Sequence, residues 1–204
     1  RKVFEKCIVK ASSIKEVGGY VRDYRDNTLD SIDSSEYESD LMEGAGSELK
    51  TKFSAIYSSS ALVVNVFASF KKYHDKINLL GYENFYTARF ERTFPTGLGG
   101  TPPTLDFCIE NKEVVIGIES KYLEILTEKE SKFTDSYYST DCIANDQKQL
   151  IKQYAGRKGL LDYAQLIKHS IGMSKYAIEN NKKAIILYLY WKPINFNSFP
   201  EYKQ

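Results

Sequence analysis

The stretch GLGGTPPTLDFCIENKEVVIGIESKYLE, residues 97–124, decides how this chain of 204 residues folds. A loop rich in Gly and Pro leads into a short apolar segment, and a polar turn separates that segment from a second apolar run at 114–118. Two apolar segments joined by a short polar turn predict an antiparallel strand pair.

Charged residues stand at the ends of these two strands. Asp106 is near the start of the first, and Glu119 and Lys121 are at the end of the second. In a short hairpin those ends lie side by side, so we expect the carboxylates to converge. Side chains alternate along a strand, so Glu119 and Lys121 point to one face. Ile118 and Ser120 then point to the other.

Two carboxylates and a lysine at one strand end suit phosphodiester hydrolysis, which needs a divalent cation, an activated water and a positive group. Asp106 and Glu119 can hold Mg²⁺, or Mn²⁺, through oxygen ligands. Lys121 can orient or deprotonate the water, or stabilise the charge of the transition state. Glu-x-Lys alone is a common pattern. The combination with Asp106 and a wholly apolar strand, which positions the pair rigidly, is more specific.

The flanking segments predict an α/β fold. A helix is expected over about 60–72, capped by one of the serines before it, with Gly81 as a residue that follows a helix. A strand is expected in the second half of 82–94. Asp162 caps a helix over 162–171, and the continuous apolar run at 184–191 is typical of a strand buried on both faces.

These elements together predict a central mixed sheet, built on a β-meander, with helices on both faces. Residues 1–43 are interpreted as an N-terminal helical and loop extension, and residues 44–204 as the core domain. In the helix over 162–171, we expect Ala164, Ile167 and Ile171 to form the buried stripe.

Composition narrows the class of protein. The net charge is +1, so a nucleic-acid-binding surface must come from local clusters of Lys and Arg. Three cysteines without paired spacing fit a reducing compartment, which predicts a cytoplasmic location. No apolar run is long enough to span a membrane. Only two histidines occur, without a Gly-x-Ser-x-Gly motif or a P-loop, which argues against serine hydrolases and nucleotide-powered enzymes.

Thr104-Leu105-Asp106 and Glu119-Ser120-Lys121 resemble the motif of the PD-(D/E)xK superfamily of restriction-endonuclease-like nucleases. The chain departs from the motif in one place, because Pro103 lies three residues before Asp106 instead of next to it. A narrower resemblance, to a bacterial group of restriction-type endonucleases, covers about residues 44–192. It is carried by the segments GSEL (46–49), YSSSALVVNVF (57–67), GLGGTPPTLD (97–106), ESKYLE (119–124) and QLIKH (165–169).

The resemblance implies a Mg²⁺-dependent deoxyribonuclease with a restriction-endonuclease-like core, which cleaves double-stranded DNA. It implies an upstream carboxylate, for which Glu48 is the candidate and Glu43 a weaker one. It also implies a supporting Gln on the later helix. Gln165, with Lys168 on the same helical face, fills that place. His169 lies one position further round, which favours a surface or capping role over a catalytic one.

Other residues are candidates for substrate binding. Arg157 and Lys158 lie close before the Gln165 helix and can reach phosphate. Asn65 is either an exposed polar residue or a helix-borne amide near the site. A homodimer is compatible with cutting both strands of a palindrome. The alternatives are a structure-specific or repair nuclease, a non-catalytic DNA-binding module of the same fold, an RNA-acting enzyme and a protein-interaction domain.

Overall fold

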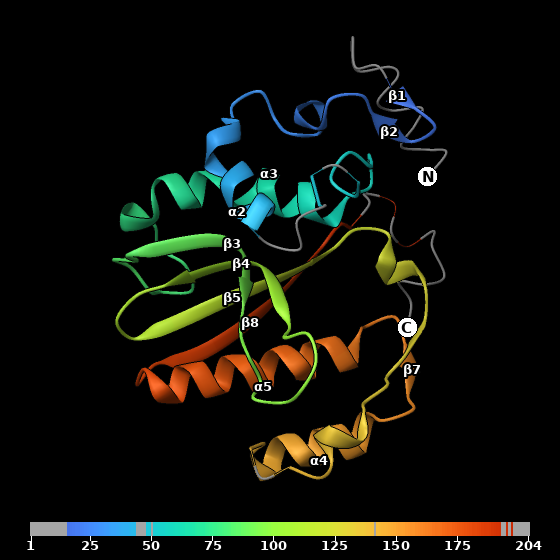
Figure 1. Cartoon of the computed structure of the whole chain (residues 1–204). Helices are drawn as coiled ribbons and strands as arrows, with labels where there is room; N and C mark the ends of the chain where they lie inside the picture. The colour runs from blue at the N-terminus through green and yellow to red at the C-terminus, as the bar shows by residue number, and fades with distance from the viewer. Residues whose placement is uncertain are drawn as a thin grey trace.

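The computed structural model describes residues 16–43, 48–49, 51–140, 142–192, 195 and 197. A four-stranded mixed sheet with strand order β3-β4-β5-β8 forms its centre (Figure 1). The strands are β3 (Thr87–Thr93), β4 (Thr104–Glu110), β5 (Val114–Lys121) and β8 (Lys183–Tyr190). The β3–β4 and β4–β5 pairs are antiparallel, which confirms the expected meander, and β8 joins β5 in parallel.

The turn between β4 and β5 is built by the side chain of Asn111. Its Oδ1 accepts hydrogen bonds from the backbone N–H groups of Glu113 (2.8 Å) and Val114 (2.9 Å). Its Nδ2 donates to the carbonyl of Glu83 at 2.7 Å. A short polar side chain that satisfies nearby backbone groups is a typical turn former, so the polar residues between the two apolar segments produce the hairpin.

Two helices cover opposite faces of the sheet, as expected (Figure 1). On one face lies α3 (Ser59–Lys72), which begins after Ser58, whose hydroxyl caps the N–H of Ala61 at 3.1 Å. On the other lies α5 (Tyr163–Glu179), capped by Asp162. Phe67 of α3 stacks on Phe107 of β4 with ring centroids 4.9 Å apart, at the centre of the larger core.

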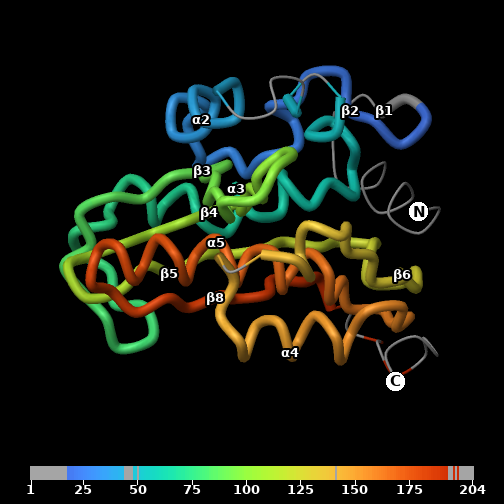
Figure 2. The backbone as a smooth tube through the Cα atoms, turned by 60° about the horizontal axis from the view of Figure 1, so that its bottom comes forward, coloured from blue at the N-terminus to red at the C-terminus, as the bar shows by residue number. Residues whose placement is uncertain are grey.

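The smaller elements surround this centre. Helix α4 (Asn145–Tyr154) packs on α5, and in Figure 1 it lies on the side of α5 away from the sheet. Figure 2 shows the same elements turned by 60°. The predicted stripe Ala164, Ile167 and Ile171 is buried, and its two isoleucines contact α4. The other elements are β1 (Glu16–Val17), β2 (Tyr20–Val21), η1 (Tyr24–Asn27), η2 (Ser34–Glu36), α2 (Glu38–Glu43), η3 (His74–Lys76), η4 (Glu124–Leu126), β6 (Lys129–Glu130), η5 (Asp135–Tyr137) and β7 (Lys158–Gly159).

The apolar run at 184–191 forms β8, whose alternate residues pack on the two cores on opposite faces of the sheet, as expected. β8 is an edge strand, however, and its residues are only half-buried or exposed because no strand pairs with its outer side among the residues described. The prediction for Gly81 was wrong. Helix α3 ends at Lys72, so Gly81, with φ of +84°, belongs to a separate turn that Leu79 and Tyr82 close. No helix in the described part of the chain is both long and apolar enough to cross a membrane.

Candidate active site

The end of β5 holds a buried ion pair. Lys121 Nζ donates a hydrogen bond to Glu119 Oε1, and the two residues are only 8% and 1% exposed. They share one face of the strand, as alternation predicts. Ser120 points to the opposite face, where its hydroxyl donates to the carbonyl of Ser59 at 3.0 Å. The strand end is therefore fixed on both sides.

Asp106 lies against this strand end. Its Oδ2 accepts a hydrogen bond from the backbone N–H of Ser120 at 2.5 Å, just beyond the last paired residues of the β4–β5 ladder, Phe107 and Ile118. The carboxylate of Glu119 is close enough to help raise the pKa of Asp106, after the larger effect of burial. The structure thus brings together the three residues that the hairpin pattern singled out.

The pKa values of Asp106, Glu119 and Lys121 are shifted in ways that suit the three residues to different roles. Burial, followed by the charge of Glu119, raises the pKa of Asp106 well above its usual range. Burial alone would raise the pKa of Glu119, but His169 and Lys121 outweigh it and hold that pKa below its usual value. Burial alone would lower the pKa of Lys121, but Glu119 raises it. Lys121 is therefore a fixed positive charge at neutral pH, better suited to stabilise negative charge than to act as a base.

Glu91, on β3, is a further acidic residue at the site, and sequence reasoning missed it. Burial, then the charges of Glu48 and Glu119, raise the pKa of Glu91 to about 7. In the β3–β4 register it lies between the pairs Phe90–Phe107 and Arg92–Leu105, which places it across from Asp106.

The backbone is irregular where Glu91 and Asp106 meet. Glu91 has φ of +51°, in the left-handed region that non-Gly residues seldom adopt. On β4, Leu105 and Cys108 both pack on the α5 side, although strict alternation would separate them. A regular strand pattern does not predict such a break. The strand itself, TARFERT, already carries Arg89 and Arg92 beside Glu91, so its charge alone did not single Glu91 out.

Glu48 approaches the same region from the segment before α3. Its Oε1 accepts a hydrogen bond from the hydroxyl of Ser60 at 2.6 Å, and its Oε2 lies 3.3 Å from Lys52 Nζ. The neighbouring Ser59 hydroxyl donates to Glu124 at 3.0 Å. The serines in the first turn of α3 therefore hold two acidic residues, while Glu43 is exposed and pairs with Arg89 instead.

Gln165 and Lys168 line a cavity of about 290 Å³ together with His169 and the Gly/Pro-rich loop, which contributes Thr101 and Pro103. The Lys168 ammonium lies over two aromatic rings from the connection before α4, at 5.6 and 5.8 Å from their centroids. The cavity also includes Asp162; burial would raise the pKa of Asp162, but hydrogen bonds from the Gln165 N–H and from Lys129 outweigh it and lower that pKa. The cavity shares His169 with the surroundings of Glu119, because His169 Nε2 is 2.9 Å from Glu119 Oε2. It therefore lies beside the strand end that carries the ion pair.

His169 is not at the surface, so its predicted surface or capping role was wrong. It is 1% exposed, and its Nε2 lies 2.9 Å from Glu119 Oε2. Neither ring nitrogen, nor Glu119 Oε2, completes a hydrogen bond of good geometry within the described residues. His169 is buried because it lies on the turn of α5 that faces the edge of the sheet. The hydrophobic pattern of the helix did not indicate this burial.

The remaining candidates lie apart from the carboxylates. The amide of Asn65 accepts from the N–H of Leu29 at 2.8 Å and donates to the carbonyl of Asn27 at 2.9 Å, so it anchors the N-terminal segment on α3. Arg157 and Lys158 are exposed beside the β6–β7 ribbon, and the Arg157 guanidinium lies over the ring of Tyr154 at 5.1 Å.

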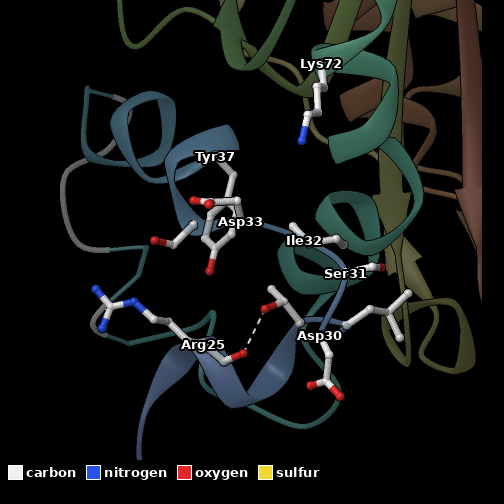
Figure 3. A pocket seen from close by; sticks show the side chains of 10 residues that line it. Arg25, Asp30, Ser31, Ile32, Asp33, Tyr37 and Lys72 are labelled. Carbon is white, nitrogen blue, oxygen red and sulfur yellow. Dashed lines mark hydrogen bonds between the residues drawn. The ribbon is translucent and has the colours of Figure 1, made fainter.

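A second cavity, of about 530 Å³, lies between the N-terminal segment and α3 (Figure 3). Arg25, Asp30 and Lys72 contribute to its lining. The two cations already pair with acidic residues of the same region, Arg25 with Glu38 at 3.0 Å and Lys72 with Glu36 at 3.3 Å. This cavity has no link to the strand ends, so we place the candidate active site at the carboxylates of the sheet.

The gathered acids present oxygen ligands, the kind that hard divalent cations prefer. Within the described ranges, no three Asp, Glu, His or Cys side chains already stand close enough to enclose an ion. In the present arrangement the Lys121 ammonium occupies one oxygen of Glu119. The site can bring negative oxygens, a fixed positive charge and an open cavity to one place.

A family model described as "Restriction Endonuclease associating with ARP" matches residues 6–202. No curated protein and no solved structure matches the chain.

Proposed function

Because the chain belongs to this family of restriction endonucleases, and thus to a family of nucleases, we propose that it is a metal-dependent endonuclease that cleaves double-stranded DNA. The observation that carries the proposal is the convergence of Asp106, Glu119 and Lys121 at one strand end. We further propose that the sheet is a restriction-endonuclease-like core, in keeping with the PD-(D/E)xK resemblance.

The donor set supports Mg²⁺, or Mn²⁺, as the cofactor. Asp106 and Glu119 would hold the ion, and Glu48 and Glu91 would act as further oxygen ligands or orient water. Glu119 Oε2 is buried without a good hydrogen bond, a costly state that a bound cation would relieve. When bound, such an ion polarises the phosphate and lowers the pKa of a coordinated water.

The protein groups supply position and charge. The Lys121 ammonium, held by Glu119, lies where it would stabilise negative charge developing on the phosphate oxygens. Gln165 and Lys168 line the adjacent cavity and would orient the DNA backbone through its phosphates. Arg157 and Lys158 would extend these contacts from the β6–β7 ribbon.

The proposal includes two partners besides DNA. A homodimer would present two such sites to the two strands of a palindromic site. The family description names association with ARP, and we extend that association to this chain as part of the proposal.

The test is incubation of the purified protein with unmethylated plasmid DNA and Mg²⁺ or Mn²⁺, followed by sequencing of the ends. We expect discrete ends from the wild type. Asp106→Asn and Glu119→Gln should each lower the cleavage rate at least about a hundredfold, because each removes a carboxylate that would hold the cation. Glu179→Gln makes the same chemical change on an exposed residue at the end of α5 and should leave the rate unaltered.

Cleavage at the wild-type rate by folded Glu119→Gln protein would end the proposal. A wild type that cuts branched DNA but leaves linear and supercoiled duplexes intact would move the assignment to a structure-specific nuclease.

A further inference from the structure

His169 is buried in surroundings that do not satisfy its ring nitrogens, unless its role is to contact Glu119. It is 1% exposed on the part of α5 nearest the end of β5. No hydrogen bond of good geometry to either ring nitrogen is found within the described residues. A buried polar group without a partner is destabilising, and an apolar residue there would avoid that cost.

The nearest polar group is Glu119. Its Oε1 accepts from Lys121 on the same strand, and its Oε2 lies 2.9 Å from His169 Nε2 on the facing helix. The two carboxylate oxygens are therefore restrained from two different elements. Rotation of the carboxylate about its last bond would bring Oε2 closer to the axis of the imidazole N–H or move it away.

α5 is held firmly enough to act as such a support. Its first turn is fixed by Asp162, which accepts from the N–H of Gln165 at 3.0 Å. One turn after His169, Gly172 approaches the sheet so closely that a Cβ there would lie 2.2 Å from the carbonyl oxygen of Phe94. His169 lies between these two anchors, so its ring has little freedom to drift from the carboxylate.

We infer that His169 is a positioning residue that, through Nε2–H, sets the orientation of the Glu119 carboxylate for binding a divalent cation. The inference rests on the proposed function and assigns to α5 a role that the motif on β5 does not contain. Residues that donate an N–H to a metal-binding carboxylate typically change metal affinity or activity about 10–100-fold when they are lost.

The test compares two substitutions. His169→Gln keeps an N–H donor at a similar reach, whereas His169→Leu fills the space without one. Mn²⁺ binding is measured by calorimetry in the absence of DNA, and cleavage of plasmid DNA is measured over a range of Mg²⁺ concentrations. We expect His169→Leu to weaken Mn²⁺ binding and to raise the half-saturating Mg²⁺ concentration about 10–100-fold. His169→Gln should restore most of both, and saturating Mg²⁺ should recover much of the rate of His169→Leu.

A purely structural role is separated by Met173→Leu, a change on the same helix where it packs on the sheet. Melting temperatures without metal report the loss of stability in each variant. Met173→Leu should keep wild-type Mn²⁺ affinity even where its stability falls.

Two results would overturn the inference. One is wild-type Mn²⁺ affinity in folded His169→Leu. The other is equal loss in the Gln and Leu variants. If the wild type and His169→Leu bind Mn²⁺ and cleave DNA equally well, the inference is wrong but the proposed function stands. A wild type that neither binds Mn²⁺ nor cleaves DNA removes the proposed function and the inference with it.

Discussion

Glu91 shows how a single residue can store unfavourable energy at a site. Its buried carboxyl group lies near the negative charges of Glu48 and Glu119. Its backbone adopts the left-handed conformation that most non-Gly residues avoid. Strain and like charge of this kind persist where the surroundings enforce them, and they gather at functional sites. Two unfavourable features at one residue mark β3 as part of the site.

The pH dependence of stability should report this cost. The pKa of Glu91 is about 7 in the fold, against an ordinary value of 4.5. A raised carboxyl pKa means that the folded state binds more protons, so stability falls as pH rises from about 4.5 through about 7. Glu91→Gln should remove that loss. It should stabilise the protein on the order of 1–3 kcal/mol at pH 8, and by much less at pH 4.5.

Urea denaturation at a series of pH values, with EDTA present, measures this difference. Glu83→Gln is the matched control, because Glu83 is exposed in the turn before β3. A stability difference between Glu91→Gln and wild type that stays constant across pH would contradict the prediction.

The residues found from sequence are those whose placement depends on local geometry. One hairpin predicts the positions of Asp106, Glu119 and Lys121, because strand pairing and side-chain alternation determine which of its side chains lie close together. Glu91 and His169 depend on a break in alternation and on the docking of a helix, neither of which leaves a periodic signal. Their positions could be obtained only from the packed structure.

At the scale of elements, the approach of α5 to the sheet decides how the site is assembled. Gly172 permits that approach, because a Cβ would meet the carbonyl oxygen and carbon of Phe94 at 2.2 and 3.0 Å. The obstacle is backbone, which cannot turn aside as a side chain would. Helix α5 and the segment after β3 must therefore separate if this position gains a side chain.

Gly172→Ala sets two effects against each other. Ala is favoured over Gly within a helix by about 1 kcal/mol, whereas overpacking of a tight core contact costs about 1–3 kcal/mol or more. Since the contact is far inside normal limits, we expect a net loss of stability and a slower cleavage rate. Thermal denaturation and plasmid cleavage check both.

Ile178→Ala is the control for that experiment. Ile178 is on the same helix but 78% exposed, so the change should stay within about 0.5 kcal/mol of wild type. A Gly172→Ala protein more stable than the wild type would show that the helix moves without penalty.

Element types were predictable because the patterns that specify them are local. Ser58 and Asp162 cap the two main helices, and Asn111 builds the hairpin turn. The position of β8 at the edge was not predictable from its apolar run. An edge strand half-covered by a helix and a strand buried on both faces have the same composition.

The whole molecule carries almost no net charge, +1 from 28 basic and 27 acidic residues. Binding to a polyanion must then depend on a few well-placed cations, because no general field attracts it. Lys168, set over aromatic rings at the mouth of the cavity beside the acids, is the best placed of those described.

Replacing Lys168 should change how DNA binding responds to salt. If its ammonium contacts one phosphate, Lys168→Gln should make the slope of log affinity against log salt shallower by about 0.9. The measurement is fluorescence anisotropy of a labelled duplex in Ca²⁺ at several salt concentrations. Lys76→Gln, on the exposed η3 turn, should leave the slope as it is. An unchanged slope for Lys168→Gln would exclude the phosphate contact.

The side chain of Asp40 affects whether one copy of the protein can pair with another at the edge of the sheet. Its Oδ2 accepts from the backbone N–H of Phe90 at 2.9 Å and from Lys71 at 2.7 Å. Phe90 lies on β3, at the border of the sheet, where a free N–H would invite a strand from another chain. Helix α2 therefore shields this part of the outer edge of β3 from pairing with a strand of another copy.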